Sequence, residues 1–242
     1  MKVLNLGCGH KVSAHRDVIN IDWSIYLRVR SNPILSAFVP IVLRGDRRKR
    51  FDSLPKNIFA YDLSRGIPFS ANSVDVIFHS NMLEHLDRDV VEQFLLNAYH
   101  VLKPGGTHRI VVPDLEYLCG LYMSHVALCD SDPSSRPDHD GFIKLLLEQS
   151  VRKEAAGTSL QPPIRRSIEN FLLGDARRRG ETHQWMYDRI NLEELLKQVG
   201  YRSVKLMRFD QSGIPNWEQY GLDKHDDGTE YAPGSLYMEA CK

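Results

Sequence analysis

Short apolar runs that end in glycine or polar residues recur along the first half of this chain, and they constrain its fold most. Five runs predict strands, at about 2–6, 18–22, 58–62, 74–79 and 107–112. An amphipathic pattern between the last two predicts a helix over Arg88 to Leu102. Alternation of short buried strands with helices is typical of an α/β fold on a parallel sheet.

The ends of two helices carry recognisable signals. Asp89 with Glu92 three residues later forms a capping-box pattern, and Lys103 to Gly106 supplies a cation, a proline and two glycines where the helix should end. A second helix is expected over Asn191 to Gly200, with Asn191 as the cap. The last predicted strands lie at about 203–209 and 235–240.

Two segments interrupt this regular pattern. Apolar helical stretches follow Asp114, at about 115–129, 140–156 and 164–174. No linker or repeat divides the chain, so the sequence predicts a single domain over 1–242 with insertions at about 28–58 and 115–190.

Composition excludes several classes of protein. Lys plus Arg equals Asp plus Glu at 31 each, which weighs against a nucleic-acid partner. The longest apolar run, Pro33 to Leu43, is shorter than the roughly 20 residues of a transmembrane helix, and no secretory leader opens the chain. We therefore expect a cytoplasmic protein with no transmembrane segment; its oligomeric state stays open.

Four cysteines bear on metal and redox chemistry. Cys8, Cys119, Cys129 and Cys241 form no C-x-x-C pair, so the sequence predicts reduced thiols and no metal site.

A glycine turn follows the first strand. Val3 to Leu6 lead into Gly7-Cys8-Gly9, where missing side chains let the backbone bend tightly and let a ligand approach peptide N–H groups. A purely structural turn is the alternative. Val12 occupies the position of the third glycine in the dinucleotide fingerprint, so a nicotinamide or flavin cofactor is disfavoured.

Polar residues also end the next strands. Asp22 ends the second, where a carboxylate can accept hydrogen bonds from a ribose diol or cap a turn. Asp62 ends the third, and His79, Ser80 and Asn81 end the fourth. Open α/β sheets bind ligands at these carboxyl ends.

Together with Leu83-Glu84-His85-Leu86 and Leu102-Lys103-Pro104-Gly105-Gly106, these motifs resemble class I S-adenosylmethionine-dependent methyltransferases of the type 11-like group. The resemblance implies a Rossmann-like, mostly parallel seven-stranded sheet with helices on both faces and a helical insertion after the fifth strand. About a dozen residues join Gly7 to the second strand, so the first helix should be short or missing.

The resemblance also implies S-adenosyl-L-methionine as cofactor. The glycine turn would contact its methionine moiety, Asp22 the ribose, Asp62 with Leu63 the adenine, and the end of the fourth strand the methionyl end. The expected cofactor-binding residues are Leu6, Gly7, Cys8, Gly9, Asp22, Trp23, Asp62, Leu63, His79, Ser80 and Asn81.

A narrower resemblance concerns the acceptor. Together with the glycine turn and Ser80 to Leu86, His183-x-x-Met186-Tyr187-Asp188 and Ser235-Leu236-Tyr237 are similar to a bacterial group linked to surface-polysaccharide genes. It implies O-methylation of a small molecule or glycan intermediate. A non-catalytic cofactor-binding or assembly subunit, and a tRNA or protein methyltransferase, are the alternatives.

A hydroxyl acceptor needs a general base, and three residues are candidates. His85 could instead position the cofactor, Asp114 could instead cap a helix, and His183 could instead pack under the insertion. Cys8 is interpreted as a small packing residue rather than a nucleophile.

Overall fold

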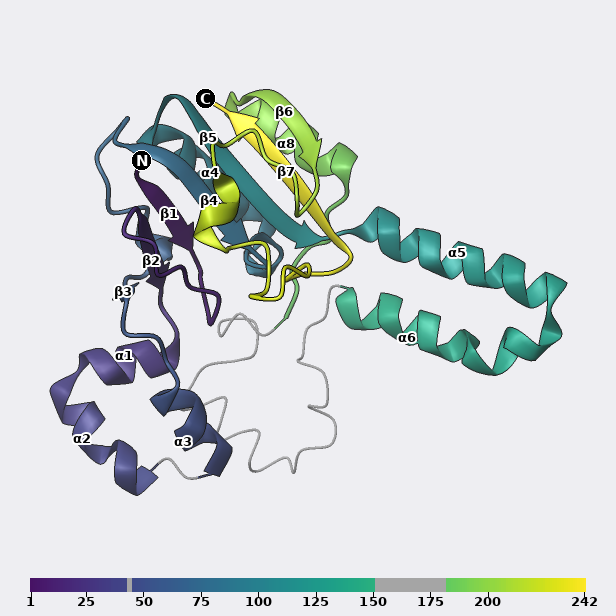
Figure 1. The fold of residues 1–242 in the computed structure, drawn as a ribbon, viewed down its shortest axis with the longest axis horizontal. Coiled ribbons are helices and arrows are strands. Elements are labelled where there is room, and N and C mark those ends of the chain that lie inside the picture. The colour runs from purple at the N-terminus through teal and green to yellow at the C-terminus, as the bar shows by residue number, and fades with distance from the viewer. Residues whose placement is uncertain (43–44, 151–181) are drawn as a thin grey trace.

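A seven-stranded mixed sheet forms the centre of the computed structural model, which describes residues 1–42, 45–150 and 182–242 (Figure 1). Its strands are β1 (Val3–Leu6), β2 (Val18–Asp22), β3 (Ile58–Ala60), β4 (Val74–Ser80), β5 (Leu102–Pro113), β6 (Arg202–Met207) and β7 (Ser235–Cys241). The spatial order is β3-β2-β1-β4-β5-β7-β6. The first five strands run parallel, and β7 pairs antiparallel with both β5 and β6. The predicted mostly parallel seven-stranded sheet is confirmed.

Helices α4 (Arg88–Val101) and α8 (Arg189–Val199) cover one face of the sheet. Apolar side chains from both helices pack on strand residues such as Leu4, Ile77 and Ile110 in one large buried cluster. Burial of this apolar area is the main stabilising term for such a sheet. The amphipathic pattern of the sequence located both helices correctly.

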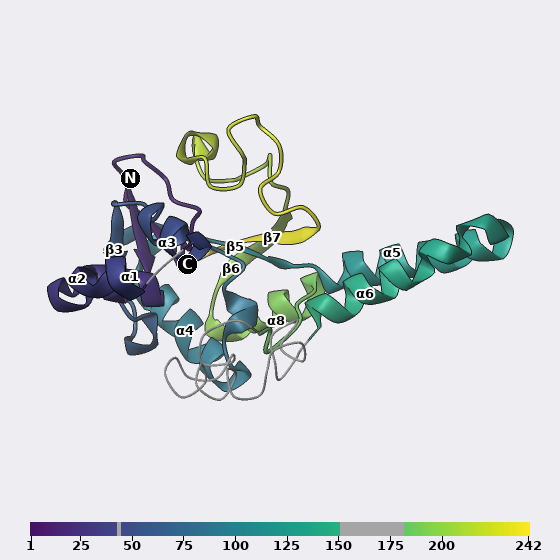
Figure 2. The same ribbon diagram turned by 90° about the horizontal axis from the view of Figure 1, so that it is seen from below.

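The opposite face is covered differently (Figure 2). The segment 208–234 lies over it and contains one short 3-10 helix, η5 (Trp217–Tyr220). Ile214, Trp217 and Tyr220 pack there on the sheet residues Val76 and Phe78. The expectation of helices on both faces is therefore corrected for this face, which is covered by apolar and aromatic side chains of a largely irregular segment.

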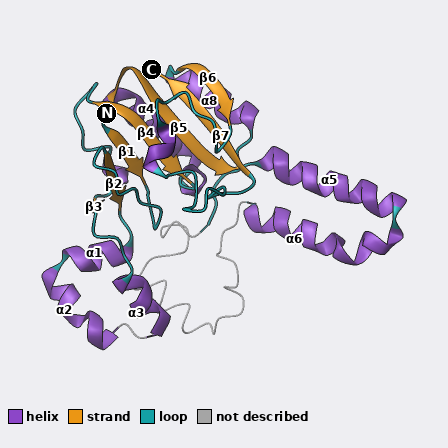
Figure 3. Cartoon of the chain, in the orientation of Figure 1, coloured by secondary structure: helices purple, strands orange, loops and turns teal. Residues whose placement is uncertain are grey.

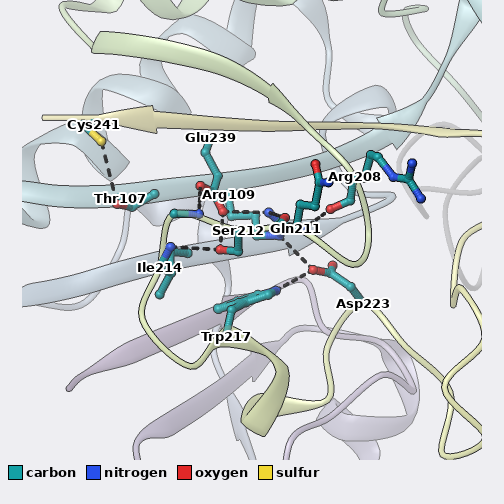
Figure 4. A network of polar contacts seen from close by, with 11 residues as sticks. Thr107, Arg109, Arg208, Gln211, Ser212, Ile214, Trp217, Asp223, Glu239 and Cys241 are labelled. Atoms are coloured by element: carbon teal, nitrogen blue, oxygen red, sulfur yellow. Dashed lines mark hydrogen bonds and ion pairs between the residues drawn. The ribbon is translucent and has the colours of Figure 1, made fainter.

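Arg109 of β5 fastens that segment to the sheet (Figure 4). Its fully buried guanidinium donates to Asp223 at 2.8 Å and to Glu239 of β7 at 2.6 Å. It also donates to the backbone carbonyls of Arg208 and Gln211. The guanidinium of Arg109 thus holds both the start of the segment, at Arg208 and Gln211, and its middle, at Asp223, against the sheet.

No helix joins β1 to β2; residues 7–17, which the structure describes throughout, form a loop, as the sequence predicted. Side-chain amides hold this loop in place. Asn5 donates to the carbonyl of Lys11 at 2.8 Å, and Asn20 accepts from the backbone N–H of Ser13 at 3.1 Å and donates to its carbonyl at 2.9 Å. The buried asparagines thus satisfy backbone groups that a helix would have paired internally.

Both predicted insertions contain helices. The stretch 28–58 includes most of α1 (Ile25–Ser31) together with α2 (Pro33–Val42) and α3 (Gly45–Asp52). After β5, α5 (Leu115–Ser131), the 3-10 helix η3 (Pro133–Asp138) and α6 (His139–Gln149) form a hairpin that projects from the sheet (Figures 1 and 3). The predicted helix at 164–174, and the end of that at 140–156, fall outside the described residues.

Three local expectations need correction. Helix α4 begins at Arg88 with Asp87 as its cap, so Asp89 lies inside the first turn. Helix α8 is capped by Asp188, and Asn191 completes the capping box from the third helical position. Lys103 to Gly106 belong to β5, which begins at Leu102 as soon as α4 ends.

No described helix is both long and apolar enough to cross a membrane.

Candidate active site

The carboxyl ends of β1 to β4 lie along one edge of the sheet, because these strands are parallel neighbours. The turn after β1 has a left-handed backbone at Gly7 (φ +60°) and Gly9 (φ +51°). A Cβ on Gly7 would lie 2.6 Å from the sulfur of Met82, whereas a Cβ on Gly9 would meet no atom within 4 Å. The turn therefore packs against the residues after β4 on one side and is open on the other.

Asp22 is tied to this turn. Its carboxylate accepts from the backbone N–H of Gly9 at 2.7 Å and from that of Ser24 at 2.8 Å. A carboxylate has about four lone-pair sites, so two remain for a ligand. Trp23, beside it, is 41% exposed, with the Arg28 guanidinium 5.4 Å from the centre of its ring.

Other residues of the first strand end are committed to packing. Leu6 is fully buried and Cys8 is 6% exposed. Burial raises the pKa of the Cys8 thiol to about 12, so the thiolate is absent at neutral pH. This position agrees with the interpretation of Cys8 as a packing residue.

Asp62 follows β3 and caps the 3-10 helix η1 (Leu63–Arg65). One carboxylate oxygen accepts from the N–H and the hydroxyl of Ser64, at 3.1 and 2.7 Å. Leu63 is partly buried against the main core. Both residues lie beside the Asp22 strand end, since β3 pairs with β2.

His79 does not line this edge with its side chain. It is fully buried between Phe94 of α4 and His108 of β5, at ring-centre distances of 5.6 and 5.0 Å. Burial lowers the pKa of His79 to about 3, so the ring is neutral. The expected contact with the methionyl end is corrected on this ground, because side chains alternate along β4 and His79 points to the α4 face.

Ser80 and Asn81 do lie at the edge. Ser80 is the last residue of β4 and is half-buried, and Asn81 is exposed. Asn81 has a left-handed backbone (φ +49°), which asparagine tolerates better than most residues. Its N–H donates to the carbonyl of Val111 at 2.9 Å and so joins the ends of β4 and β5.

Two of the candidate bases meet beyond Asn81. The rings of His85 and His183 lie edge to face with centres 4.8 Å apart. His85 ends the 3-10 helix η2 (Leu83–His85), and His183 precedes α8. The Glu84 carboxylate completes the cluster, with one oxygen 3.7 Å from Nε2 of His85.

Hydrogen bonds fix the tautomers of both rings. Nδ1 of His85 lies 3.3 Å from the carbonyl of Thr182, and Nδ1 of His183 lies 2.8 Å from that of Gln149. A carbonyl oxygen only accepts, so each Nδ1 carries the proton and each Nε2 of the neutral ring has a free lone pair. Both histidines can therefore act as bases at Nε2.

Glu84 is the site residue that sequence reasoning missed. It is 1% exposed, and neither carboxylate oxygen has a hydrogen-bond partner in the described part of the chain. Burial raises the pKa of Glu84 to about 8, which keeps the group protonated near neutral pH. The signal was a glutamate inside an otherwise apolar strand-end motif, where a charged side chain is rarely buried.

Asp114 has a structural contact instead. It caps α5 by accepting from the N–H of Glu116 at 2.9 Å. The pKa of its carboxyl group is raised, mainly because the group is partly buried. Of the two interpretations left open by the sequence, helix capping agrees with this geometry.

A cavity of about 410 Å³ lies away from this cluster. Residues 209–218 and 221–224 line it, and Asp223 there already accepts from Arg109 and Trp217. It belongs to the segment that covers the opposite face of the sheet (Figure 4).

Residues 43–110 match the family model described as a methyltransferase domain. This match includes β3, β4, η2 and α4, and hence Asp62, Glu84 and His85. This segment of the chain is therefore similar to a methyltransferase domain. No curated protein matched it.

Solved methyltransferase structures show only distant similarity. A SAM-dependent methyltransferase from Archaeoglobus fulgidus is 13% identical, with coverage of 100% of this chain and 86% of that one and a TM-score of 0.42. One from Aquifex aeolicus is 14% identical (99% and 81% covered, TM-score 0.42). The 1,6-didemethyltoxoflavin-N1-methyltransferase of Burkholderia thailandensis, with bound S-adenosylhomocysteine, is 15% identical (99% and 70%, TM-score 0.42). None of these structures indicates an acceptor for this chain.

The residues at this sheet edge fit S-adenosylmethionine as cofactor. The open side of Gly9 leaves room for a ligand against the backbone, and Asp22 retains acceptor capacity beside it. The exposed Trp23 follows Asp22 at the end of β2, and the exposed Asn81 follows Ser80 at the end of β4. S-adenosylmethionine would supply a methyl group already activated by the positive sulfonium.

Proposed function

We propose that this chain is an S-adenosylmethionine-dependent methyltransferase that transfers a methyl group to an oxygen of a small molecule or glycan intermediate, with His183 as the general base. A single domain over 1–242, with insertions at about 28–58 and 115–190, would carry the reaction. Cytoplasmic polysaccharide biosynthesis is the setting that we propose for it.

The observation that carries the proposal is the pair of histidines next to the glycine turn. Met82 packs on Gly7, and its carbonyl accepts from the N–H of His85 at 3.1 Å. His85 in turn contacts His183. A continuous set of contacts therefore joins the proposed methionine-binding turn to two basic nitrogens.

A hydroxyl acceptor is a weak nucleophile until its proton is removed, and a positioned base contributes about 10²–10⁴-fold. In the proposed step the acceptor oxygen forms a bond to the methyl carbon while the carbon–sulfur bond breaks and its electron pair goes to sulfur. The hydroxyl proton goes to Nε2 of His183. The Gln149 carbonyl, which accepts from Nδ1–H at 2.8 Å, stabilises the resulting imidazolium.

His183 suits this role better than its two neighbours. Burial is the main cause that lowers the pKa of His85, and its Nε2 faces the Glu84 carboxyl group. Glu84 is protonated at neutral pH and cannot accept a proton. We therefore assign His85 and Glu84 to positioning, and His183 to proton acceptance.

The neighbourhood of His183 suits a sugar acceptor. Trp185 is partly buried two residues later, and the guanidinium of Arg88 lies 4.0 Å from the centre of its indole ring. An aromatic surface beside a guanidinium suits a polar ring that carries an acidic or phosphate group. This supports a phosphorylated or acidic glycan intermediate over an apolar acceptor.

Methyl-labelled S-adenosylmethionine tests the proposal directly. The protein would be incubated with nucleotide sugars and acidic oligosaccharides, and in parallel with tRNA and with cell proteins. We expect label in a methyl ether of the sugar samples. Transfer to tRNA or protein alone would reject the glycan assignment, and cofactor binding without transfer to any acceptor would favour the non-catalytic subunit.

A further inference from the structure

A second cluster of metal-binding side chains lies in the projecting hairpin. His125 and Cys129 are four residues apart on α5 and thus share one helix face, and His139 is the first residue of α6. One donor atom from each residue lies within 4.8 Å of the others. The three come from the last two turns of α5 and the start of α6, at the end of the hairpin away from the sheet (Figure 1).

The spacing of the donor atoms resembles that around zinc. Nδ1 of His125 lies 3.1 Å from Nδ1 of His139 and 3.5 Å from the Cys129 sulfur. Tetrahedral zinc, with bonds of about 2.0–2.1 Å to nitrogen and about 2.3 Å to sulfur, separates two nitrogens by about 3.4 Å and nitrogen from sulfur by about 3.6 Å. Shifts of a few tenths of an ångström would bring these two pairs to that geometry.

Ring packing holds the histidines in these positions. His125 is 6% exposed and stacks on Phe142 with ring centres 4.0 Å apart. His139 lies 5.5 Å from the ring of Tyr122 and stacks on His125 at 5.3 Å. Aromatic neighbours that restrict the imidazoles reduce the entropy lost when a metal binds.

The hairpin lacks the apolar core that would otherwise join two helices. Helix α6 has no buried residue in its described range, and α5 has two, Leu118 and His125. The buried position nearer the hairpin end is therefore occupied by a histidine, which is costly to bury without a partner. Metal binding supplies folding free energy where such a core is small.

We propose that His125, Cys129 and His139 bind a zinc ion that joins α5 to α6. Nitrogen and thiolate ligands favour zinc over magnesium or calcium, which prefer oxygen. The fourth position is left for water. The ion would make the hairpin rigid without taking part in methyl transfer, since the Glu84–His85–His183 cluster is separate from it. The sequence-based prediction of no metal site followed from cysteine spacing, and this proposal departs from it on the geometry of one cysteine with two histidines.

Cobalt(II) and zinc binding to the metal-free full-length protein test this. We expect one equivalent of cobalt, the visible bands of a tetrahedral site and a near-ultraviolet thiolate charge-transfer band, all removed by one equivalent of zinc. Cys129→Ser and His139→Gln should weaken zinc binding by more than about 100-fold, because loss of an outer-shell partner alone costs about 10–100-fold. Cys119→Ser, an exposed cysteine on the same helix, should bind as the wild type does.

Alkylation of the unmodified protein tests the site without relying on folded variants. Zinc should slow alkylation of Cys129 and leave that of Cys119 unchanged, as measured by peptide mass spectrometry. A folded wild-type protein that gives no thiolate–cobalt band would overturn the proposal. So would equal zinc affinity in the Cys129→Ser variant, or loss of zinc on His183→Gln, which would assign the ion to the other cluster.

Discussion

The imidazoles of His85 and His183 contact each other edge to face with ring centres 4.8 Å apart, although one follows β4 and the other precedes α8. Each donates its Nδ1–H to a backbone carbonyl and keeps Nε2 free. His85 is the neighbour of Glu84 in sequence. Its N–H donates to the carbonyl of Met82, which packs on Gly7 of the glycine turn. Acceptor chemistry and cofactor binding can therefore be separated by mutation.

His183→Ala should lower kcat by about 10²–10⁴-fold, because the base that accepts the acceptor proton is lost. Its affinity for S-adenosylmethionine should stay at the wild-type value, since His183 packs on His85 and donates to the Gln149 carbonyl, neither of which is a proposed cofactor residue. Steady-state kinetics and calorimetry measure the two quantities. His100→Ala, an exposed histidine of α4, is the control and should change neither. Unchanged kcat in His183→Ala would remove it from the reaction.

Asp22→Ala should weaken cofactor binding by roughly 2–4 kcal/mol, because charge-assisted hydrogen bonds to the ribose are lost. Part of this loss would come from the turn, since Asp22 also accepts from Gly9 and Ser24. Asp22→Asn keeps one accepting oxygen and should bind with intermediate affinity. Calorimetric titration measures the affinities of the wild type and of both variants. Asp89→Ala, in the first turn of α4, is the control and should bind the cofactor as the wild type does. Equal affinity in Asp22→Ala and wild type would exclude the ribose contact.

Glu84 should make stability depend on pH. Its pKa is raised from 4.5 to about 8 in the folded protein, so the folded state holds a proton that the unfolded state releases. Its contribution is complete below pH 4.5 and is lost as pH rises toward about 8, by about 1.4 kcal/mol per pH unit.

Urea unfolding of wild type and Glu84→Gln measures this contribution, because glutamine has the same shape and does not titrate. The stability of the wild type relative to the variant should fall between pH 5 and pH 8 and then level off. A difference independent of pH would mean that Glu84 has an ordinary pKa. The comparison cancels the opposite effect of the buried neutral His79.

Arg109→Met should destabilise the fold by about 3–5 kcal/mol, because two buried carboxyl groups, of Asp223 and Glu239, lose their cation. Arg208→Ala breaks an exposed pair with Asp210 and should cost less than about 1 kcal/mol. Chemical denaturation compares the two variants. Similar small effects would show that the 208–234 segment is held by its apolar side chains alone.

The local hydrophobic pattern was sufficient to predict the strands of the sheet. It did not predict contacts between segments that are distant in sequence. Strands such as β2 and β4 were located to within a residue, because alternation and burial are encoded within each run. The residues Ile214, Trp217 and Tyr220 that cover the opposite face have no helical spacing, so local pattern did not predict this cover. His85 and His183 were each candidates, but their contact depends on tertiary structure. His79 was misassigned because successive side chains of a strand point to opposite faces. Phe78 points to the face covered by 208–234, so His79 points to the α4 face.

Calorimetric titration of the purified protein with S-adenosylmethionine and S-adenosylhomocysteine tests the central claim most directly, with a nicotinamide dinucleotide as the negative control. We predict micromolar binding of both adenosyl ligands, loss of that binding in Asp22→Ala, and no heat from the dinucleotide. A folded protein that binds neither adenosyl ligand would contradict the assignment of a methyl-donor site to this sheet edge.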